Sequence, residues 1–546
     1  MQIRNKITYM ITTSNPTGKK NTQFEWVLLI LLVVGYYSWL SVNTVYSASV
    51  DGRLLEVFDG DEFSHFDIVS KALTNHTLCV EWTVYGHFYF NIVLFPLFIL
   101  QRFTPVSDQL LVLVLRYVST LSSILTVIMT FGLAKRYFDS FVAWISSIFL
   151  MIVPYIFNYW SVTSHPDTLQ MFTIVCGMFA CCEYLLSKKN KWLIIAAFFA
   201  GMAFSTKYAG IFLMPIIWFL CFGIFVEPIK KIKRDFLHLP SLLQAFWLVF
   251  ITGVSFLIAF ALASPCLVLD LKFFPGLIRV VQVTSSGYLY QINHRRIEWF
   301  EVLSSTSLLG VLNSVLLAFA LAWFIFKTWK TKGEELQSPK GLLWVWVLFY
   351  FAVAFFSANV RENRYLLVII PFIFILLADF LVSVLDYIGR KFSRKFVFHF
   401  MFGAIVVFGV LELWEGVLRQ LELIETRQTR ENNNPVIEAG KWLEVNYQPS
   451  SRILYDKYSY VPSKFTQVWG TYNMDATLVE DVKPRVIVIN SSIRDIFRDS
   501  YMANSYVDGP ERFMEIHDFY DALEAEQLGY VLVADFGSVR IYQKER

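Results

Sequence analysis

Residues 244–264 read QAFWLVFITGVSFLIAFALAS, an apolar run that contains no charged residue. About 20 apolar residues are enough for a helix to cross the hydrocarbon core of a membrane. Runs of this kind recur along the chain, and the sequence therefore predicts about eleven membrane spans. The runs lie at 24–47, 109–134, 140–158, 166–186, 190–206, 208–226, 244–264, 303–327, 341–358, 365–387 and 396–416.

The composition fits this interpretation. Of 546 residues, 56% are hydrophobic and 17% are charged, whereas a soluble domain carries roughly 25% charged residues. This excludes a disordered chain and a nucleic-acid binder, and it argues against a soluble enzyme. The six cysteines form no C-x-x-C metal motif. Four of them lie in apolar runs, and a disulfide between Cys79 and Cys266, which fall in polar loops, is an open alternative.

The basic residues predict the topology, because short cytoplasmic loops are enriched in Lys and Arg. Basic clusters lie on one side only if the ambiguous run 87–103 is interfacial or re-entrant, so that the N-terminus is cytoplasmic. The alternative is that 87–103 spans the membrane, which would place Arg234 and its neighbours outside. The clusters are Lys19-Lys20, Lys135-Arg136, Lys188-Lys189-Lys191, Lys230-Lys231-Lys233-Arg234, Lys327-Lys330-Lys332 and Arg390-Lys391-Arg394-Lys395.

The tail beyond residue 416 has a different character. Strand-like runs at 451–456, 485–490, 530–535 and 538–543 alternate with helical patterns near 435–446 and 511–528. We therefore expect an all-α polytopic membrane domain with about 11–13 spans, followed by a small α/β extracytoplasmic domain. The expected domains are a cytoplasmic tail (1–23), a membrane domain (24–416, with outer loops 48–108 and 265–302) and an extracytoplasmic domain (417–546).

An acidic cluster follows the first span. Asp59, Asp61, Glu62 and Asp67 lie within nine residues, with His65 one turn after Asp61. Phe66, Val69 and Leu73 form an apolar stripe typical of a helix on a membrane surface. Helix capping by Asp59, with Glu62 at the third helical position, is the structural alternative. Capping does not explain why so many acids gather at the lipid boundary, where ionisable residues are costly and often functional.

Three further charged sites are predicted on the outer side. Asp167 follows Ser164-His165-Pro166 at the start of a span, which is also an ordinary helix start. Lys207 lies alone between two close spans and needs an anionic partner, either Asp167 or a ligand. Arg361 and Arg364 flank a tight turn, where they could hold a phosphate or simply anchor the interface.

In order and spacing, these motifs resemble the GT-C class of polytopic glycosyltransferases. The branch that the chain resembles contains protein O-mannosyltransferases and the aminoarabinose transferases that modify lipid A. At Gly86-His87 the chain departs from the double proline of many members. The motifs that carry the resemblance are Gly60-Asp61-Glu62 with His65, Tyr85 to Phe90, Arg116 to Thr120, His165-Pro166-Asp167, Ser205-Thr206-Lys207, Ser264-Pro265 and Arg364-Tyr365-Leu366-Leu367.

The resemblance implies transfer of a hexosyl or pentosyl group from a polyprenyl-phosphate sugar to a lipid, glycan or protein acceptor at the outer membrane face. Asp61 is then the first candidate for the catalytic base and Glu62 the second. His65, Asp167, Lys207, Arg361 and Arg364 are candidates for binding substrate. A divalent metal at Asp61 is the one cofactor implied. The location is a bacterial inner membrane, or the endoplasmic reticulum in a eukaryote.

A polytopic transporter or lipid flippase is the alternative function. It would account for the spans but not for the outer α/β domain, and the paired repeats of many transporters are not seen. Neither the sugar nor the acceptor can be identified from the sequence.

Overall fold

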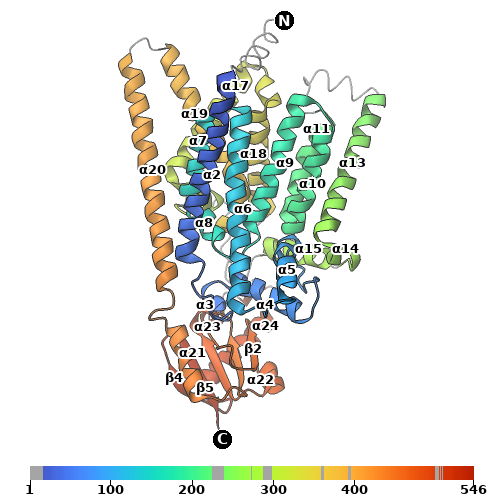
Figure 1. Cartoon of the computed structure of the whole chain (residues 1–546). Helices are drawn as coiled ribbons and strands as arrows, with labels where there is room; N and C mark the ends of the chain where they lie inside the picture. Colours follow the sequence, from blue (N-terminus) through green and yellow to red (C-terminus); the bar gives the residue numbers. More distant parts are fainter. Residues whose placement is uncertain are drawn as a thin grey trace.

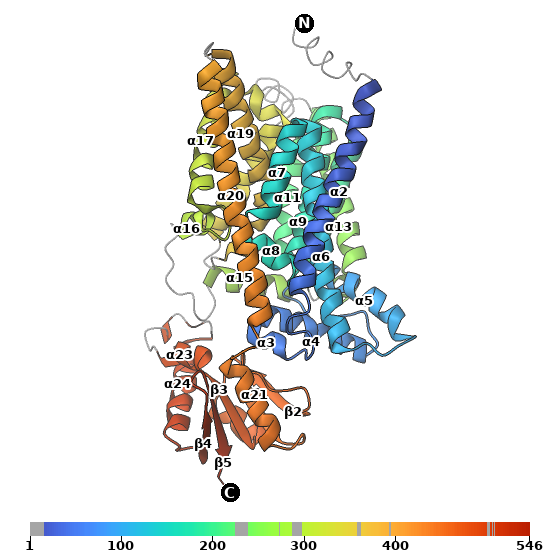
Figure 2. The ribbon, with the colours of Figure 1, turned by 60° about the vertical axis from the view of Figure 1, so that its left-hand side comes forward.

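The computed structural model describes residues 16–223, 239–271, 273–286, 298–357, 362–391, 395–498, 503–504, 506 and 508–545. A long helical bundle carries a small α/β domain at one end, and the N-terminus lies at the other end (Figure 1). Helices α3 (Leu54–Phe58) and α4 (Gly60–Thr74) lie between the bundle and the small domain, and α5 (Phe88–Gln101) lies to the side of that end of the bundle (Figures 1 and 2). The loop after the first span and the C-terminal tail therefore share one end of the molecule, as the basic clusters predict.

Seven helices within the described residues are long and apolar enough to span a membrane, and an eighth span results if α7 (Ser140–Ile152) and α8 (Tyr155–Ser161), bent by 70°, count as one. The chain is thus a multi-pass membrane protein, but the expected 11–13 spans exceed this number. Runs 190–206 and 208–226 give only α10 (Lys191–Thr206) and the pair η1 (Tyr208–Phe212) and α11 (Leu213–Cys221). The seven are α2 (Pro16–Thr44), α6 (Asp108–Tyr137), α9 (Asp167–Ser187), α13 (Leu239–Ala263), α17 (Gly310–Lys330), α18 (Pro339–Ser357) and α19 (Ile370–Lys391) with the preceding turn η3 (Asn363–Ile369).

Helix α20 (Lys395–Thr429) contains the last predicted run and leads from the bundle to the small domain (Figure 2). Part of that run lies outside the residues whose side chains are described. The basic cluster at 230–234 lies outside the described residues altogether. At the end of the bundle that carries the N-terminus, Lys135 pairs with Glu25 and Arg136 with Glu183.

Two features fix the loop between α2 and α6. The apolar stripe on α4 was expected to face the membrane surface, but it is buried inside the protein, with Phe66, Val69 and Leu73 packed against α5 and α6. A disulfide joins Cys79 to Cys266, which lies in α14 (Pro265–Leu269) directly after the span α13. Helix α5 has 14 residues and is not among the candidate spans. This agrees with an interfacial position for the run 87–103.

The small domain is a five-stranded mixed sheet in the order β2-β1-β3-β5-β4. Strand β1 (Arg452–Asp456) pairs in parallel with β2 (Gln467–Thr471) and β3 (Val486–Asn490), while β5 (Val539–Lys544) pairs antiparallel with β3 and β4 (Tyr530–Asp535). The sequence prediction missed β2, an edge strand whose side chains are mostly exposed. The surrounding helices are α21 (Pro435–Asn446), α22 (Ala476–Val482), α23 (Ser491–Arg498) and α24 (Pro510–Glu524).

Candidate active site

Charged residues from four separate elements meet where the bundle adjoins the small domain. Asp61 lies in the first turn of α4, Asp167 begins α9, Lys207 separates α10 from η1, and Arg364 lies in η3. All four were candidates from the sequence, and the structure brings them together. Arg361 lies outside the described residues.

The cluster is a continuous string of polar contacts that runs from Asp61 through Arg364, His165 and Asp167 to Lys207. Arg364 pairs with Asp61 through its Nη1 atom, which also lies 3.2 Å from Nε2 of His165. On its other side, Nδ1 of His165 is 2.7 Å from the Asp167 carboxylate. The second oxygen of Asp167 accepts a hydrogen bond of 2.6 Å from Nζ of Lys207. Arg364 is therefore neutralised by two carboxylates, because its Nε atom also pairs with Glu362, and Lys207 is neutralised by Asp167.

Aromatic rings surround both cations. Nζ of Lys207 lies 5.0 Å from the centre of the Tyr85 ring and 5.5 Å from that of Tyr365. The Arg364 guanidinium lies 5.5 Å from the ring of Trp160. Such cation–π contacts stabilise desolvated charge. Because the cations are also mostly buried, at 7% and 8% exposure, their positions are well defined before any ligand arrives.

Asp61 differs from the rest of the cluster in its access to solvent. Its side chain is 40% exposed, whereas His165 is fully buried. Burial opposes ionisation, but the Arg364 guanidinium and His165 outweigh it and hold the pKa of Asp61 well below its usual range. Asp61 is consequently ionised and reachable, but it is paired with a cation.

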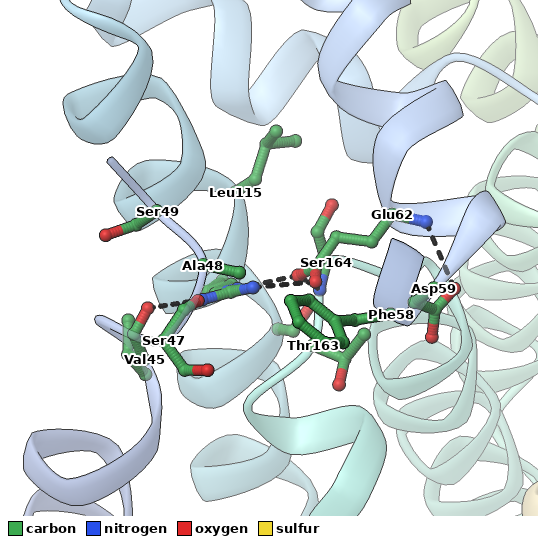
Figure 3. A network of polar contacts seen from close by, with 12 residues as sticks. Val45, Ser47, Ala48, Ser49, Phe58, Asp59, Glu62, Leu115, Thr163 and Ser164 are labelled. Atoms are coloured by element: carbon green, nitrogen blue, oxygen red, sulfur yellow. Dashed lines mark hydrogen bonds and ion pairs between the residues drawn. The ribbon is translucent and has the colours of Figure 1, made fainter. Parts of the chain in front are cut away.

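The two neighbouring acids have structural contacts. Asp59 caps α4, accepting hydrogen bonds from the backbone N–H groups of Asp61 and Glu62 at 3.1 and 3.2 Å (Figure 3). The predicted cap is thus confirmed. Tyr159 donates a further bond of 2.9 Å to the same carboxylate. This is enough to account for an acid at position 59.

Glu62 is fully buried and doubly paired. Its carboxylate accepts two hydrogen bonds from Arg116, at 2.6 and 2.7 Å, and one from the backbone N–H of Ser164 at 2.8 Å (Figure 3). Burial opposes its ionisation, yet Arg116 and Arg427 lower the pKa of Glu62 to about 2. Glu62 has no access to solvent, and Arg116 binds both of its carboxylate oxygens, so it is badly placed to take a proton. This argues against Glu62 as a base.

His65 lies behind the string rather than in it. Its Nδ1 atom is 2.7 Å from the carbonyl oxygen of Ser164, so this nitrogen carries the proton. The ring packs 5.2 Å from the ring of His165. Burial, with a smaller contribution from His165, lowers the pKa of His65 to about 4. His65 is therefore neutral, and its hydrogen bond and ring packing hold the segment around Ser164 in place.

The residues present do not fit a metal ion as they are arranged. Within the part of the chain that the structure describes, no group of three or more His, Cys, Asp or Glu side chains is placed to hold one. The accessible carboxylate, Asp61, already contacts Arg364 and His165.

Sequence reasoning quoted some site residues without selecting them and missed others. His165 bridges two carboxylates, and its place next to Asp167 was the available signal. Trp160 packs 4.4 Å from the ring of His165. Arg427 lies fully buried near the end of α20, 3.9 Å from Glu62, and hydrogen bonds to Thr163. No local pattern distinguishes this arginine from the surface charges around it.

Comparison with known proteins places this geometry in context. Residues 94–264 match the family described as dolichyl-phosphate-mannose-protein mannosyltransferase. No curated protein matches the sequence. Among solved structures, ArnT from Cupriavidus metallidurans bound to undecaprenyl phosphate is 11% identical, with a TM-score of 0.55 over 94% of this chain and 97% of that one.

The archaeal oligosaccharyltransferase AglB from Archaeoglobus fulgidus, in complex with an inhibitory peptide and a dolichol-phosphate, is 13% identical. Its TM-score is 0.52, over 90% of this chain and 72% of that one. Another structure of the Archaeoglobus enzyme is a complex with Zn and sulfate, again at 13% identity and with a TM-score of 0.53 over 95% and 73%. The resemblance to GT-C glycosyltransferases is thereby confirmed: the chain has their fold, and its segment 94–264 has the sequence pattern of dolichyl-phosphate-mannose-protein mannosyltransferases.

Proposed function

We propose that this chain is a membrane glycosyltransferase that transfers a hexosyl or pentosyl group from a polyprenyl-phosphate sugar to a lipid, glycan or protein acceptor. The family match and the shared fold support the class of enzyme. The observation that carries the proposal is the meeting of two buried cations with one accessible carboxylate at the end of a membrane bundle. The cations can bind the phosphate of a donor at the membrane surface, and the carboxylate can accept the proton of an incoming hydroxyl group.

The cations are the phosphate contacts in this proposal. When the bond between the anomeric carbon and the phosphate oxygen breaks, its electron pair leaves with the phosphate, and negative charge develops there. Arg364 offers a planar fork of N–H groups and Lys207 a compact positive charge. Asp167 anchors Lys207 directly and reaches Arg364 through His165.

Donor binding then activates the base. The phosphate competes with Asp61 for Arg364, so Asp61 exchanges a neighbouring cation for a neighbouring anion, and its pKa rises. The acceptor oxygen attacks the anomeric carbon from the face opposite the phosphate, while its proton passes to Asp61. This single displacement inverts the anomeric centre. Without a donor, Asp61 stays paired with Arg364, which suppresses wasteful proton abstraction.

The chemistry is tested with purified protein and a panel of polyprenyl-phosphate sugars, with and without EDTA to detect a divalent metal. We expect one donor to be consumed, more slowly by Arg364→Lys, which keeps the charge but loses the fork, and least by Arg364→Ala. Arg136→Lys is the control, because Arg136 also pairs with a carboxylate but at the opposite end of the bundle.

Two outcomes would overturn the proposal. Donor saturation that is unchanged in both Arg364 variants would reduce this arginine to an anchor. Movement of an intact polyprenyl lipid across vesicle membranes without release of sugar would favour the flippase.

The side of the membrane is tested separately. We propose that the small domain is extracytoplasmic, at the plasma membrane of a bacterium or in the lumen of the endoplasmic reticulum. The cysteines of the wild-type chain give little background, because Cys79 and Cys266 form a disulfide and the other four are buried. In a bacterial host, Ser538→Cys in the turn between β4 and β5 should react with an impermeant maleimide in intact cells. Reaction only after permeabilisation would reverse the topology.

A further inference from the structure

One edge of the small domain lies beside the start of α4, next to Asp61. Strands β1 and β2 are parallel neighbours, so their carboxyl ends lie at the same edge of the sheet. Open sheets with parallel strands bind ligands just beyond these carboxyl ends. Tyr458 lies in the turn after β1, and Tyr472 directly follows β2.

Both tyrosines approach the start of α4. A Cβ atom built on Gly60 would lie 3.0 Å from Cε1 of Tyr458 and 3.4 Å from the hydroxyl oxygen of Tyr472. The residue next to Gly60 is Asp61. The centres of the two tyrosine rings are 5.8 Å apart, in an edge-to-face arrangement. Tyr472 is 38% exposed, which resembles the 40% exposure of the Asp61 side chain.

This edge is fixed to the loop that carries Asp61. Glu56, on α3, is buried between the two parts. Its carboxylate contacts Nζ of Lys457 at 2.7 Å and accepts a hydrogen bond of 3.0 Å from the hydroxyl of Tyr455. Arg53 donates to the carbonyl oxygen of Pro462 at 3.0 Å, and Asp51 accepts from the Tyr460 hydroxyl at the same distance. The domain therefore cannot drift away from Asp61 without breaking buried polar contacts.

The turn that bears Tyr458 is also held from within the domain. The carbonyl oxygen of Tyr458 accepts a hydrogen bond of 2.9 Å from Nδ2 of Asn490, at the end of β3. The backbone N–H of Asn490 donates in turn to Asp456 at 3.1 Å. Asp456 also accepts a hydrogen bond of 2.6 Å from the Tyr520 hydroxyl group. Tyr458 is thus positioned as firmly as a residue of the sheet itself.

We propose that Tyr458 and Tyr472 form the acceptor-binding surface and that the acceptor is a glycan, either free or as the head group of a lipid. This inference rests on the proposed function. Phenol rings pack against the C–H faces of sugars, and their hydroxyl groups hydrogen bond to sugar hydroxyls. A peptide would be bound differently, by pairing with the backbone along the free edge of β2, whereas the two tyrosines lie beyond the ends of β1 and β2.

The test separates acceptor binding from chemistry. With a donor that the wild type consumes, we measure hydrolysis of the donor by water and transfer to glycolipids extracted from host membranes. Tyr458→Ala and Tyr472→Ala should raise the KM for these acceptors by about tenfold, the scale of a lost polar or packing contact in a specificity site. Donor hydrolysis should stay within about twofold of the wild type.

Tyr472→Phe is compared with Tyr447→Phe, which removes a hydroxyl bound to Gln543 elsewhere in the same domain. Only Tyr472→Phe should affect the acceptor KM. Equal loss of hydrolysis and transfer, or an unchanged acceptor KM, overturns the inference. Labelling of host proteins in place of glycolipids overturns the choice of a glycan. A wild type that neither hydrolyses nor transfers any donor contradicts the proposed function instead.

Discussion

Asp61 and Glu62 are adjacent acids on one helix, yet their surroundings differ completely. Glu62 is fully buried with its carboxylate bound by Arg116, whereas the side chain of Asp61 is 40% exposed and pairs with Arg364. One residue along a helix turns a side chain by about 100°, which here separates the protein core from the open side of α4. The comparison shows that an acidic motif indicates where a site lies, whereas burial decides which of its acids is accessible for chemistry.

The largest effect is expected for Glu62→Gln. Removing the negative charge leaves Arg116 and Arg427 buried without compensation, and breaking a buried ion pair from one side costs roughly 3–5 kcal/mol. We expect a large drop in the Tm of the detergent-solubilised protein.

Glu62→Gln combined with Arg116→Met is the control. Removing both charges should recover part of the lost stability, because Arg116 is then no longer left as a buried charge without its partner. An unchanged Tm in Glu62→Gln would show that this ion pair does not hold the loop.

The next largest effect is expected for Asp61→Asn, in activity instead of stability. A lost general base costs roughly 10²–10⁴-fold in turnover. The amide keeps the shape and removes the basicity, and stability should change less than in Glu62→Gln because Arg364 keeps its ion pair with Glu362. Transfer rate and Tm are measured together; normal transfer by Asp61→Asn would reject it as the base and reopen the question for Glu62.

A third acid, Asp456, sharpens the comparison, because burial is the largest influence on its pKa. Among the described residues it forms no ion pair, and burial raises its pKa to about 7, against the hydrogen bonds from Tyr520 and Asn490. Between about pH 4 and 7 the folded state then binds more protons than the unfolded state. Stability should therefore fall as the pH rises through this window, by at most about 1.4 kcal/mol per pH unit.

Hydrogen exchange in β1 and α24, measured across pH 4 to 8, gives the local stability of this domain. Asp456→Asn should flatten the pH dependence relative to the wild type. Parallel profiles in the two proteins would contradict a buried, protonated Asp456.

The smallest effect is expected for Asp59→Ala. Loss of an N-cap costs about 1 kcal/mol, and the site keeps all its charges. Asp59→Asn should retain most of the capping. The Tm should fall slightly in Asp59→Ala, with turnover almost unchanged; a loss of turnover like that of Asp61→Asn would assign Asp59 a part in the chemistry.

The parts of the fold that were predictable depend on short stretches of chain. The membrane runs, the cap at Asp59, the stripe through Phe66 and the four apolar strands all carry their signal within about 20 residues. Strand β2 carries no such local signal and was missed. An exposed edge strand is held by backbone pairing with β1 and needs no apolar pattern of its own. Two of the predicted runs, 190–206 and 208–226, form helices shorter than a full span for a related reason: an apolar run gives no indication of whether it forms one long helix or two short ones.

The sequence by itself determined a membrane protein with an α/β domain after its last apolar run, and it marked Asp61, Asp167, Lys207 and Arg364 as charges in need of partners. Only the tertiary structure decided which partners they have, because Asp61 and Arg364 are 303 positions apart in the chain. It alone buried Glu62 against Arg116, joined two carboxylates through His165, and set Tyr472 beside Gly60, the residue next to Asp61. Desolvation and ion pairing depend on distances in space, and these distances set the roles of chemically similar side chains.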